Sequence, residues 1–435
     1  MAFSLRGIHV PHRKNTAKMS AVRMPAPQSV TLLTVMHIGR PATPVVKVGT
    51  HVDVGTLVAE QSGLISSPVY ASVSGTVKKI TEEIVSTGAR VPAITIESDG
   101  AMTVDASIAP PVVNSKEDFI EALKKSGIVG LGGAGFPTYV KFMTDKPVDT
   151  LVINGAECEP YITSDTRTMI EKADEIRLAI ETADKYMNFA KIIIGIEKNK
   201  PEAIEKMQEL AKSNNKIQVA VLPSVYPQGG EKVLVYHTTG KKIKLGQLPA
   251  DVGRIVSNIS TLAAIGDYLK TGMPLVERLV TVDGGAVKEP KNVLVPVGTP
   301  VKDVFEFCGG FTVDPEKVLY GGPMMGITVP DLDVPVLKQT NALLAFTEKE
   351  AKMPKTTACI HCGTCVNSCP FGINVLGIAK GLQIGDMDMV EKAGVETCME
   401  CGCCAFGCPA NRPIVQNNKL AKLALRDHKA KEAKA

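Results

Sequence analysis

Residues 359–370 read CIHCGTCVNSCP, and residues 398–409 nearly repeat them as CMECGCCAFGCP. Both stretches follow C-x2-C-x2-C-x3-C-P, the spacing of bacterial proteins that hold two four-iron clusters. In this pattern the fourth cysteine of each array binds the cluster of the other array. The first predicted set of cluster ligands is Cys359, Cys362, Cys365 and Cys408. The second predicted set is Cys398, Cys401, Cys404 and Cys369.

Two structural zinc sites are the alternative interpretation of these arrays, because zinc sites also use C-x2-C. A zinc ribbon pairs two distant C-x2-C knuckles, and a third cysteine two residues later has no place in it. The arrays therefore favour iron–sulfur clusters. Cys403, Cys158 and Cys308 fit no ligand position, and we interpret them as small buried apolar residues.

The length of 435 residues indicates about three domains, and 44% hydrophobic with 22% charged residues is typical of a folded soluble protein. The formal net charge is +4, and residues 419–435 alone hold six Lys or Arg against two acids. The remainder is balanced, which argues against broad binding of nucleic acid. For the basic tail, a solvated helix is favoured over a contact with anionic lipid or an acidic partner.

Residues 1–19 lack the continuous apolar run of a secretory signal, so we expect no export. No run of about 18 apolar residues occurs in the sequence, so we expect no membrane span. Eleven cysteines in a chain that stays in a reducing compartment favour metal binding over disulfides.

Residues 30–110 contain short β-rich runs broken by Gly and Pro, which predicts a small all-β module. Residues 45–80 resemble a barrel-sandwich domain of the lipoyl and biotinyl type. Between Lys47 and Lys78 there is no lysine to carry such a cofactor. A structural or docking role is therefore expected.

From 115 to 222, strand-like apolar runs alternate with amphipathic helical ones, which predicts a parallel sheet covered by helices. Residues 223–270 add turns and one helix, and residues 275–330 return to a β pattern. The proline-containing segment 328–355 is predicted to be a linker to the cysteine-rich part.

The stretch VGLGGAGFPTYVKF at 129–142 satisfies G-x-G-x-x-G through Gly130, Gly132 and Gly135. It is not an ordinary dinucleotide loop, because a helix is expected before it, a proline follows, and no acid ends the next strand. Its four glycines still let backbone amides approach an anionic or planar ligand.

Four stretches resemble, in order, motifs of the NADH-binding flavoprotein subunit of respiratory complex I: GLGGAGFPTYVK (130–141), NGAECEP (154–160), YPQGGEKVL (226–234) and SNISTLA (257–263). The resemblance implies FMN and NAD(H) as cofactors, with Lys141 at the FMN phosphate. Around the flavin it implies Gly132, Gly133, Gly135, Asn154, Tyr226, Asn258 and Thr261. Facing the flavin or the dinucleotide it implies Phe136, Glu157, Glu159 and Glu231. The chain departs from the family pattern at Ala156, Gly230 and Ser260, which replace acidic residues.

The order of modules resembles the C subunit of Rnf-type ferredoxin:NAD oxidoreductases. This implies a multidomain α/β chain with a barrel-sandwich β module, a Rossmann-like flavoprotein domain, a β-grasp domain and a helical ferredoxin-type domain with two [4Fe-4S] clusters. The expected boundaries are 1–112, 113–272, 273–335 and 336–435.

The resemblance also implies an electron-transfer subunit on the cytoplasmic face of a membrane complex that moves Na⁺ or H⁺. Expected partners are the other subunits, above all a ferredoxin-like one, and NAD(H), with no nucleic acid. Hydride transfer needs no protein acid or base, so no catalytic side chain is named. A cobalamin reductase of microcompartment type and a flavin-free electron relay are the alternatives.

Overall fold

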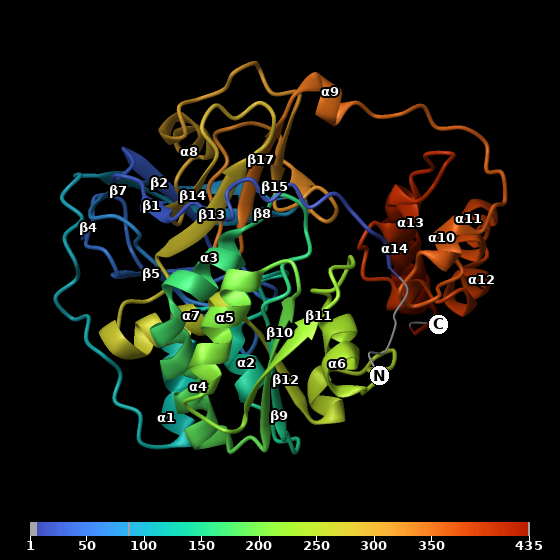
Figure 1. Ribbon diagram of the computed structural model, residues 1–435. Helices are drawn as coiled ribbons and strands as arrows, with labels where there is room; N and C mark the ends of the chain where they lie inside the picture. The colour runs from blue at the N-terminus through green and yellow to red at the C-terminus, as the bar shows by residue number, and fades with distance from the viewer. Residues whose placement is uncertain (1–6, 86–87, 434–435) are drawn as a thin grey trace.

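A computed structural model describes residues 7–85 and 88–433 of the chain (Figure 1). Its middle holds a four-stranded, fully parallel sheet. The strands are apolar runs rich in Val and Ile, which suit a sheet that is covered on both faces. Their order across the sheet is β11 (Ile217–Leu222), β10 (Lys191–Glu197), β9 (Thr150–Asn154) and β12 (Arg254–Asn258).

Helices cover both faces of this sheet (Figure 1). One face packs against α1 (Lys116–Lys125), α2 (Thr138–Phe142), α3 (Ser164–Glu171), α4 (Ala173–Met187), α5 (Pro201–Ala211) and α7 (Ile259–Thr271). The other face packs against α6 (Glu231–Thr239) and the 3-10 helix η1 (Pro249–Val252). The predicted parallel sheet and its helical layers are confirmed.

Two features of this domain differ from the sequence analysis. The amphipathic helical run over 166–187, which the sequence pattern predicts as one helix, is divided at Lys172 into α3 and α4. Residues 223–270 contain a strand, β12, in addition to helices. β12 pairs directly with β9. The carboxyl ends of these two strands together form the edge of the sheet described below.

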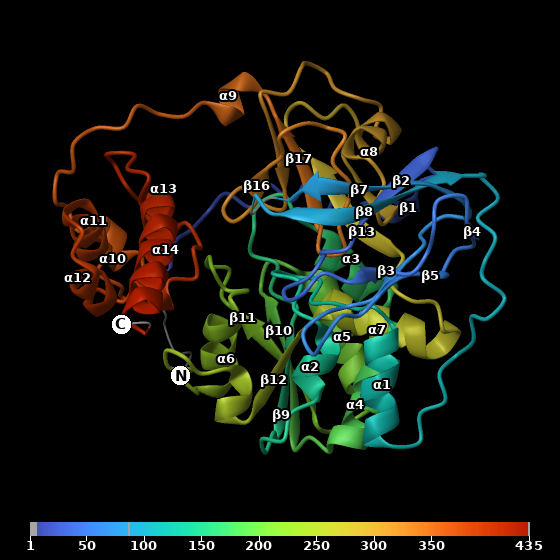
Figure 2. The same cartoon turned by 180° about the vertical axis from the view of Figure 1, so that it is seen from behind.

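The expected all-β module is confirmed as two small sheets that share one core (Figure 2). The first contains β2 (Ser29–Leu33), β8 (Arg90–Ser98), β7 (Gly75–Ile84) and β4 (His51–Val52). The second contains β3 (Thr43–Pro44), β5 (Leu57–Glu60) and β6 (Val69–Tyr70).

A six-stranded sheet joins three distant parts of the chain. Its order is β1 (Ala21–Arg23), β14 (Lys291–Pro296), β13 (Glu277–Asp283), β17 (Ala342–Phe346), β15 (Lys317–Tyr320) and β16 (Ile327–Thr328), with α8 (Val301–Phe307) packed beside it. Strand β1 lies parallel to β14, with Ala21 opposite Asn292. The sheet therefore extends beyond residues 273–335 at both ends.

The expected linker over 328–355 contains a strand, because all five residues of β17 are buried between β13 and β15. The connecting segment begins only after α9 (Glu348–Ala351) and runs to the cysteine-rich domain (Figures 1 and 2).

The C-terminal domain is helical, as expected. It contains α10 (Thr364–Asn367), α11 (Val375–Ile384), α12 (Met387–Lys392), the 3-10 helix η2 (Val395–Thr397), α13 (Cys403–Phe406) and α14 (Ile414–Glu432). Asn418, Ala421 and Leu425 of α14 are buried in its core. Within residues 419–433 only Ala421 and Leu425 are buried, so the basic segment is a helix that packs on one face and is open to solvent on the other.

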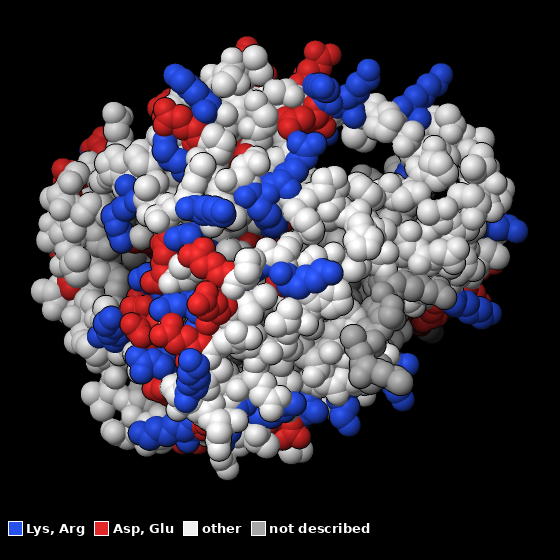
Figure 3. Space-filling model, in the orientation of Figure 1, with Lys and Arg blue, Asp and Glu red and all other residues white. Residues whose placement is uncertain are grey.

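Charged side chains of both signs mix over the face that carries α4 and α5, whereas the visible face of the C-terminal domain is mostly uncharged (Figure 3). Within residues 7–85 and 88–433, no helix combines the length and the apolar character needed to cross a bilayer.

Candidate functional site

The carboxyl ends of β9 and β12 carry two asparagines side by side, because Asn154 and Asn258 are register partners. The Asn154 amide accepts from the Ala156 N–H (3.1 Å) and donates to the Gly229 carbonyl (2.9 Å). Asn258 caps α7, and its side chain accepts from Thr261 N–H (3.2 Å). Ligands of open parallel sheets bind at this edge of the sheet.

The glycine loop lies over these asparagines. The Leu131 N–H donates to the Thr261 hydroxyl (3.0 Å), which fixes the loop to α7. A Cβ on Gly132 would lie 2.4 Å from Asn258 Nδ2, whereas a Cβ on Gly133 would meet no atom within 4 Å. Gly132 is thus required by packing, and Gly133 borders open space that suits a flat ligand.

The barrel-sandwich module forms a wall beside the other end of the loop. Gly135 has φ +70°, its carbonyl accepts from Ile38 N–H (3.1 Å), and a Cβ there would lie 3.4 Å from His37 Cα. Burial lowers the pKa of His37 to about 4. The Phe136 carbonyl closes the loop by accepting from Gly130 N–H (2.8 Å). The module therefore contacts the glycine loop directly, and its structural or docking role stays a prediction.

Lys141 extends from α2 to the middle of β12. Its ammonium donates to the Val256 carbonyl (2.9 Å) and to the Glu231 carboxylate (3.1 Å) at the start of α6. About a quarter of the Lys141 side chain is exposed (26%), so the cation remains accessible to an anion from solvent. A phosphate there would meet one lysine and one competing carboxylate.

Asp165 is a site residue that the sequence analysis did not identify. Its carboxylate accepts from Asn258 Nδ2 (2.8 Å) and from the Ser260 hydroxyl (2.5 Å), and burial raises its pKa. A glutamate at 260 would put a second carboxylate against Asp165. The sequence alone shows that Ser260 replaces an acid of the family pattern. The link to the buried Asp165 becomes clear only in the structure, where the segments that carry Ser260 and Asp165 are in contact.

Glu157 is engaged by the start of α3. Its carboxylate accepts from Asp165 N–H (2.7 Å) and from the Thr166 hydroxyl (2.7 Å), and burial raises its pKa to about 7. The Lys14 ammonium lies 3.9 Å away. Only 5% of Glu157 is exposed, so its carboxylate serves the protein interior.

Glu159 joins this domain to the six-stranded sheet. Its carboxylate accepts from the N–H groups of Met324 (3.0 Å) and Met325 (2.9 Å), which follow β15. A Cβ on Gly322 would lie 2.2 Å from a Glu159 oxygen. Burial raises the pKa of Glu159 to about 7.

One half-buried lysine, Lys14, and one buried lysine, Lys200, hold the loop between these glutamates, and the sequence analysis missed both. Lys14 donates to the carbonyls of Glu157 (2.9 Å) and Glu159 (2.8 Å), and burial lowers its pKa. Lys200 donates to the Glu157 carbonyl (3.1 Å) and to the Glu197 carboxylate (2.6 Å). The loop is therefore fixed before any ligand binds.

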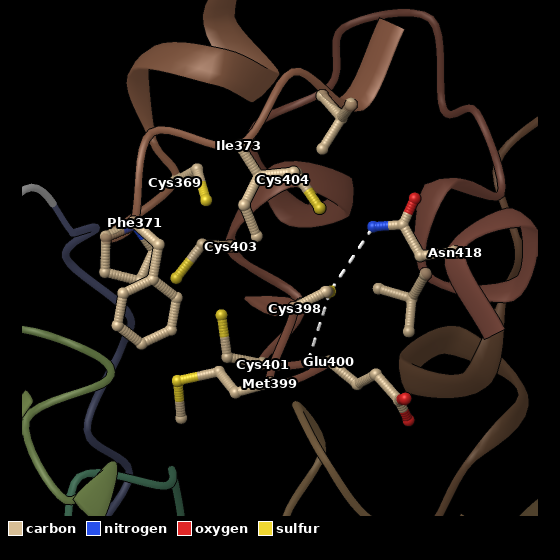
Figure 4. A pocket seen from close by; sticks show the side chains of 14 residues that line it. Cys369, Phe371, Ile373, Cys398, Met399, Glu400, Cys401, Cys403, Cys404 and Asn418 are labelled. Carbon is tan, nitrogen blue, oxygen red and sulfur yellow. Dashed lines mark hydrogen bonds between the residues drawn. The ribbon is translucent and has the colours of Figure 1, made fainter. Parts of the chain in front are cut away.

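The eight cysteines of the two arrays line two separate cavities. One cavity is lined by Cys359, Cys362, Cys365 and Cys408. The other is lined by Cys369, Cys398, Cys401 and Cys404, together with Cys403 (Figure 4). The cavities divide the cysteines in the same way as the two predicted ligand sets.

Each cavity is lined by four cysteines of one predicted set, which is the number of thiolates that a [4Fe-4S] cluster needs. Among the described residues, no three Cys, His, Asp or Glu side chains are placed to hold one metal ion. Cys359 and Cys362 are exposed, while Cys369, Cys401 and Cys404 are buried.

The buried cysteine set lies against the flavoprotein-like domain. The Tyr226 hydroxyl donates to the Cys401 carbonyl (2.7 Å), and Tyr226 is 2% exposed. A Cβ on Gly230, where the chain departs from the acidic residue of the family pattern, would lie 2.5 Å from the Met399 methyl. Cys158 packs into the same apolar junction.

Four protein-family models match the chain in the expected order. Their descriptions are RnfC barrel sandwich hybrid domain (residues 3–101), Nuo51 FMN-binding domain (123–267), SLBB domain (279–328) and 4Fe-4S dicluster domain (352–409). A crystal structure of an NAD⁺-reducing [NiFe]-hydrogenase in the H2-reduced state is similar in fold. Its TM-score is 0.50 at 16% identity, over 71% of this chain and 61% of that one.

Curated relatives match nearly the whole chain. The C subunit of the Na⁺-translocating ferredoxin:NAD⁺ oxidoreductase complex of Acetobacterium woodii is 43% identical over 96% of this chain and 95% of its own. The proton-translocating counterpart of Clostridium ljungdahlii is 41% identical over 90% and 86%. The C subunit of the ion-translocating oxidoreductase complex of Rhodobacter capsulatus is 39% identical over 99% and 85%. The chain belongs to the family of C subunits of ion-translocating ferredoxin:NAD⁺ oxidoreductase complexes.

Proposed function

We propose that this chain is the electron-transfer subunit of a ferredoxin:NAD⁺ oxidoreductase complex that couples the reaction to Na⁺ or H⁺ movement. It binds FMN and NAD(H) at the glycine loop and two [4Fe-4S] clusters at the cysteine sets. It sits peripherally on the cytoplasmic face of the membrane and exchanges electrons with a ferredoxin-like subunit. The observation that carries the proposal is the direct Tyr226–Cys401 contact between the two cofactor regions.

FMN, when bound, exchanges electron pairs with NAD(H) and single electrons with iron–sulfur clusters. The residues of the chain provide position and charge. Lys141 binds the phosphate, because its ammonium is partly exposed beside the sheet edge. Gly133 leaves room for the ring system, and Asn154 with Asn258 shapes the floor beneath it.

The remaining implied residues fall into two groups. Gly132, Gly135, Tyr226 and Thr261 build the loop and its junction, and Phe136 with Glu231 borders the dinucleotide. For Glu157 and Glu159 we propose a positioning role, because protein N–H and O–H groups already occupy their carboxylates.

We assign the cysteine ligands of each cluster according to the cavity that they line. Cys359, Cys362, Cys365 and Cys408 hold the cluster near solvent, which suits exchange with a partner protein. Cys398, Cys401, Cys404 and Cys369 hold the cluster beside the flavoprotein-like domain. We keep the boundaries at 112 and 272 and move the third from 335 to beyond β17; β1 joins the sheet of the third domain from the N-terminal part.

The test is anaerobic reconstitution of the full chain. We expect released flavin on denaturation, bleaching by NADH, and about eight irons per chain. Lys141→Ala should lower the flavin content and leave the iron content unchanged, with exposed Lys206→Ala as the matched control. Iron without flavin in the wild type would support a relay subunit instead, and equal loss of flavin and iron in Lys141→Ala would contradict the division into two sites.

A further inference from the structure

The two cysteine arrays repeat each other in backbone conformation as well as in spacing. His361 and Glu400, at equivalent positions, both have positive φ, at 55° and 60°. Gly363 and Gly402, two residues later, have φ of 74° and 81°. Such left-handed residues turn the chain sharply, so successive cysteine side chains point into one cavity.

The repeat extends to the hydrogen bonds of the first cysteine in each array. The His361 N–H donates to Cys359 Sγ, and the Glu400 N–H donates to Cys398 Sγ, both over 3.4 Å. These are backbone donors, so they do not depend on the identity of the side chain. They show that equivalent positions in the two arrays face equivalent sulfurs.

The second cysteine of the first array has a hydrogen bond with a side chain. Thr364 Oγ1 lies 3.3 Å from Cys362 Sγ. At the equivalent position of the other array stands Cys403, and its thiol donates to the Tyr226 carbonyl over 3.8 Å. Figure 4 shows the Cys401 and Cys403 side chains next to each other. Cys403 fits no ligand position, and it occupies in the second array the position that Thr364 occupies in the first.

The direction of these bonds follows from the chemistry of the ligand. A cysteine that binds iron is a thiolate, which accepts hydrogen bonds and donates none. The Thr364 hydroxyl is then the donor to Cys362, and the single thiol proton of Cys403 is divided between Cys401 and the Tyr226 carbonyl. A hydroxyl is a strong donor and a thiol a weak one, so the two arrays differ in the strength of this one bond.

We propose that Thr364 and Cys403 are equivalent positioning residues that donate to the second ligand sulfur of each cluster and raise its reduction potential, Thr364 strongly and Cys403 weakly. Reduction adds negative charge that the ligand sulfurs share, and a donor stabilises it; hydrogen bonds to sulfur are among the factors that set such potentials. The inference rests on the cluster ligands of the proposed function.

The second set has a further side-chain donor, because Asn418 Nδ2 donates to Cys398 Sγ (3.4 Å). We therefore compare the reduction potential of each cluster before and after its own donor is changed. This comparison does not depend on which of the two clusters has the higher potential.

The test is a redox titration of the full-length reconstituted protein, followed by electron paramagnetic resonance. Thr364→Val, which keeps the shape but loses the hydroxyl, should move one reduction step to lower potential, and Thr364→Ser should leave that step in place. Cys403→Ala should move the other step down by a smaller amount, and Cys403→Ser should move it up. Thr364→Ala replaces the valine variant if valine lowers the iron content.

An unchanged step in Thr364→Val with full iron content would overturn the proposal. So would the same step moving in the Thr364→Val and Cys403→Ala variants, or iron loss in Cys403→Ala, which would make Cys403 a ligand. A wild type that binds fewer than two clusters would instead refute the proposed function, so the two failures are distinguishable.

Discussion

The hydroxyl of Tyr226 donates a hydrogen bond of 2.7 Å to the carbonyl of Cys401, and this contact joins the flavoprotein-like domain to the buried cysteine set. Cys403 returns the contact, because its thiol lies 3.8 Å from the Tyr226 carbonyl. The two segments thus hold each other through side chain and backbone. Since the rest of the connection after α9 is an extended segment, this junction fixes the distance between the two regions.

Tyr226→Phe should loosen this junction. The buried Cys401 carbonyl would lose its donor, which costs about 1–3 kcal/mol of unfolding free energy. Cluster reduction after mixing with NADH should also slow. Tyr320→Phe is the matched control, because its hydroxyl donates to the Pro335 carbonyl (2.6 Å) away from the clusters. Equal reduction rates in wild type and Tyr226→Phe would contradict this role.

Gly132→Ala and Gly133→Ala should separate folding from ligand binding. The first places a methyl group 2.4 Å from Asn258 Nδ2 and should cost about 1–3 kcal/mol of unfolding free energy, measured with denaturant. The second meets no protein atom within 4 Å, so stability should be unchanged while flavin content falls. Normal flavin content in Gly133→Ala would show that the ring lies elsewhere.

Gly230→Ala should disturb the domain junction through Met399. The new methyl group would lie 2.5 Å from the Met399 methyl, so the methionine must move and the contact with Tyr226 weakens. We expect slower NADH-driven reduction of the clusters with flavin and iron contents retained. Adding Met399→Ala should restore much of the rate, because it removes the clash. No rescue in the double variant would place the effect of Gly230→Ala outside this contact.

His37 should make the protein less stable in acid. Its pKa is about 4 in the folded chain and 6.5 in a solvated one, so the unfolded state binds more protons between these values. Stability from this group is full above pH 6.5 and is lost as the pH falls towards 4, by up to about 3 kcal/mol. His37→Asn should flatten this part of the curve of unfolding free energy against pH, whereas exposed His51→Asn should not.

Patterns within short stretches of sequence predicted those helices and strands that neighbouring residues determine. The apolar runs of β9, β10 and β11 are long and β-branched, and their alternation with helices specified the parallel sheet. Strand β17 was missed because prolines precede it and its partners lie far away in sequence. The pairing of Ala21 with Asn292 has no local signal at all.

The same contrast holds at the site. Cysteine spacing anticipated how the two cavities divide the eight cysteines, because the fourth cysteine of each array is carried to the other by the intervening helices. The roles of Asp165 and Lys14 depend on contacts between distant segments, and a single sequence does not contain them. The contact between Gly230 and Met399 also joins distant segments, and no pattern in the sequence indicated it.

The early position of β1 also affects how the chain is made. Its partner β14 emerges from the ribosome roughly 15–50 s later at typical synthesis rates of about 5–20 residues per second. During that interval the nascent β1 has unpaired backbone groups, and for about the first half of it Lys14 lacks the Glu157 and Glu159 carbonyls that accept from it. Biogenesis of this protein therefore includes a waiting period in which its first strand needs protection from wrong partners.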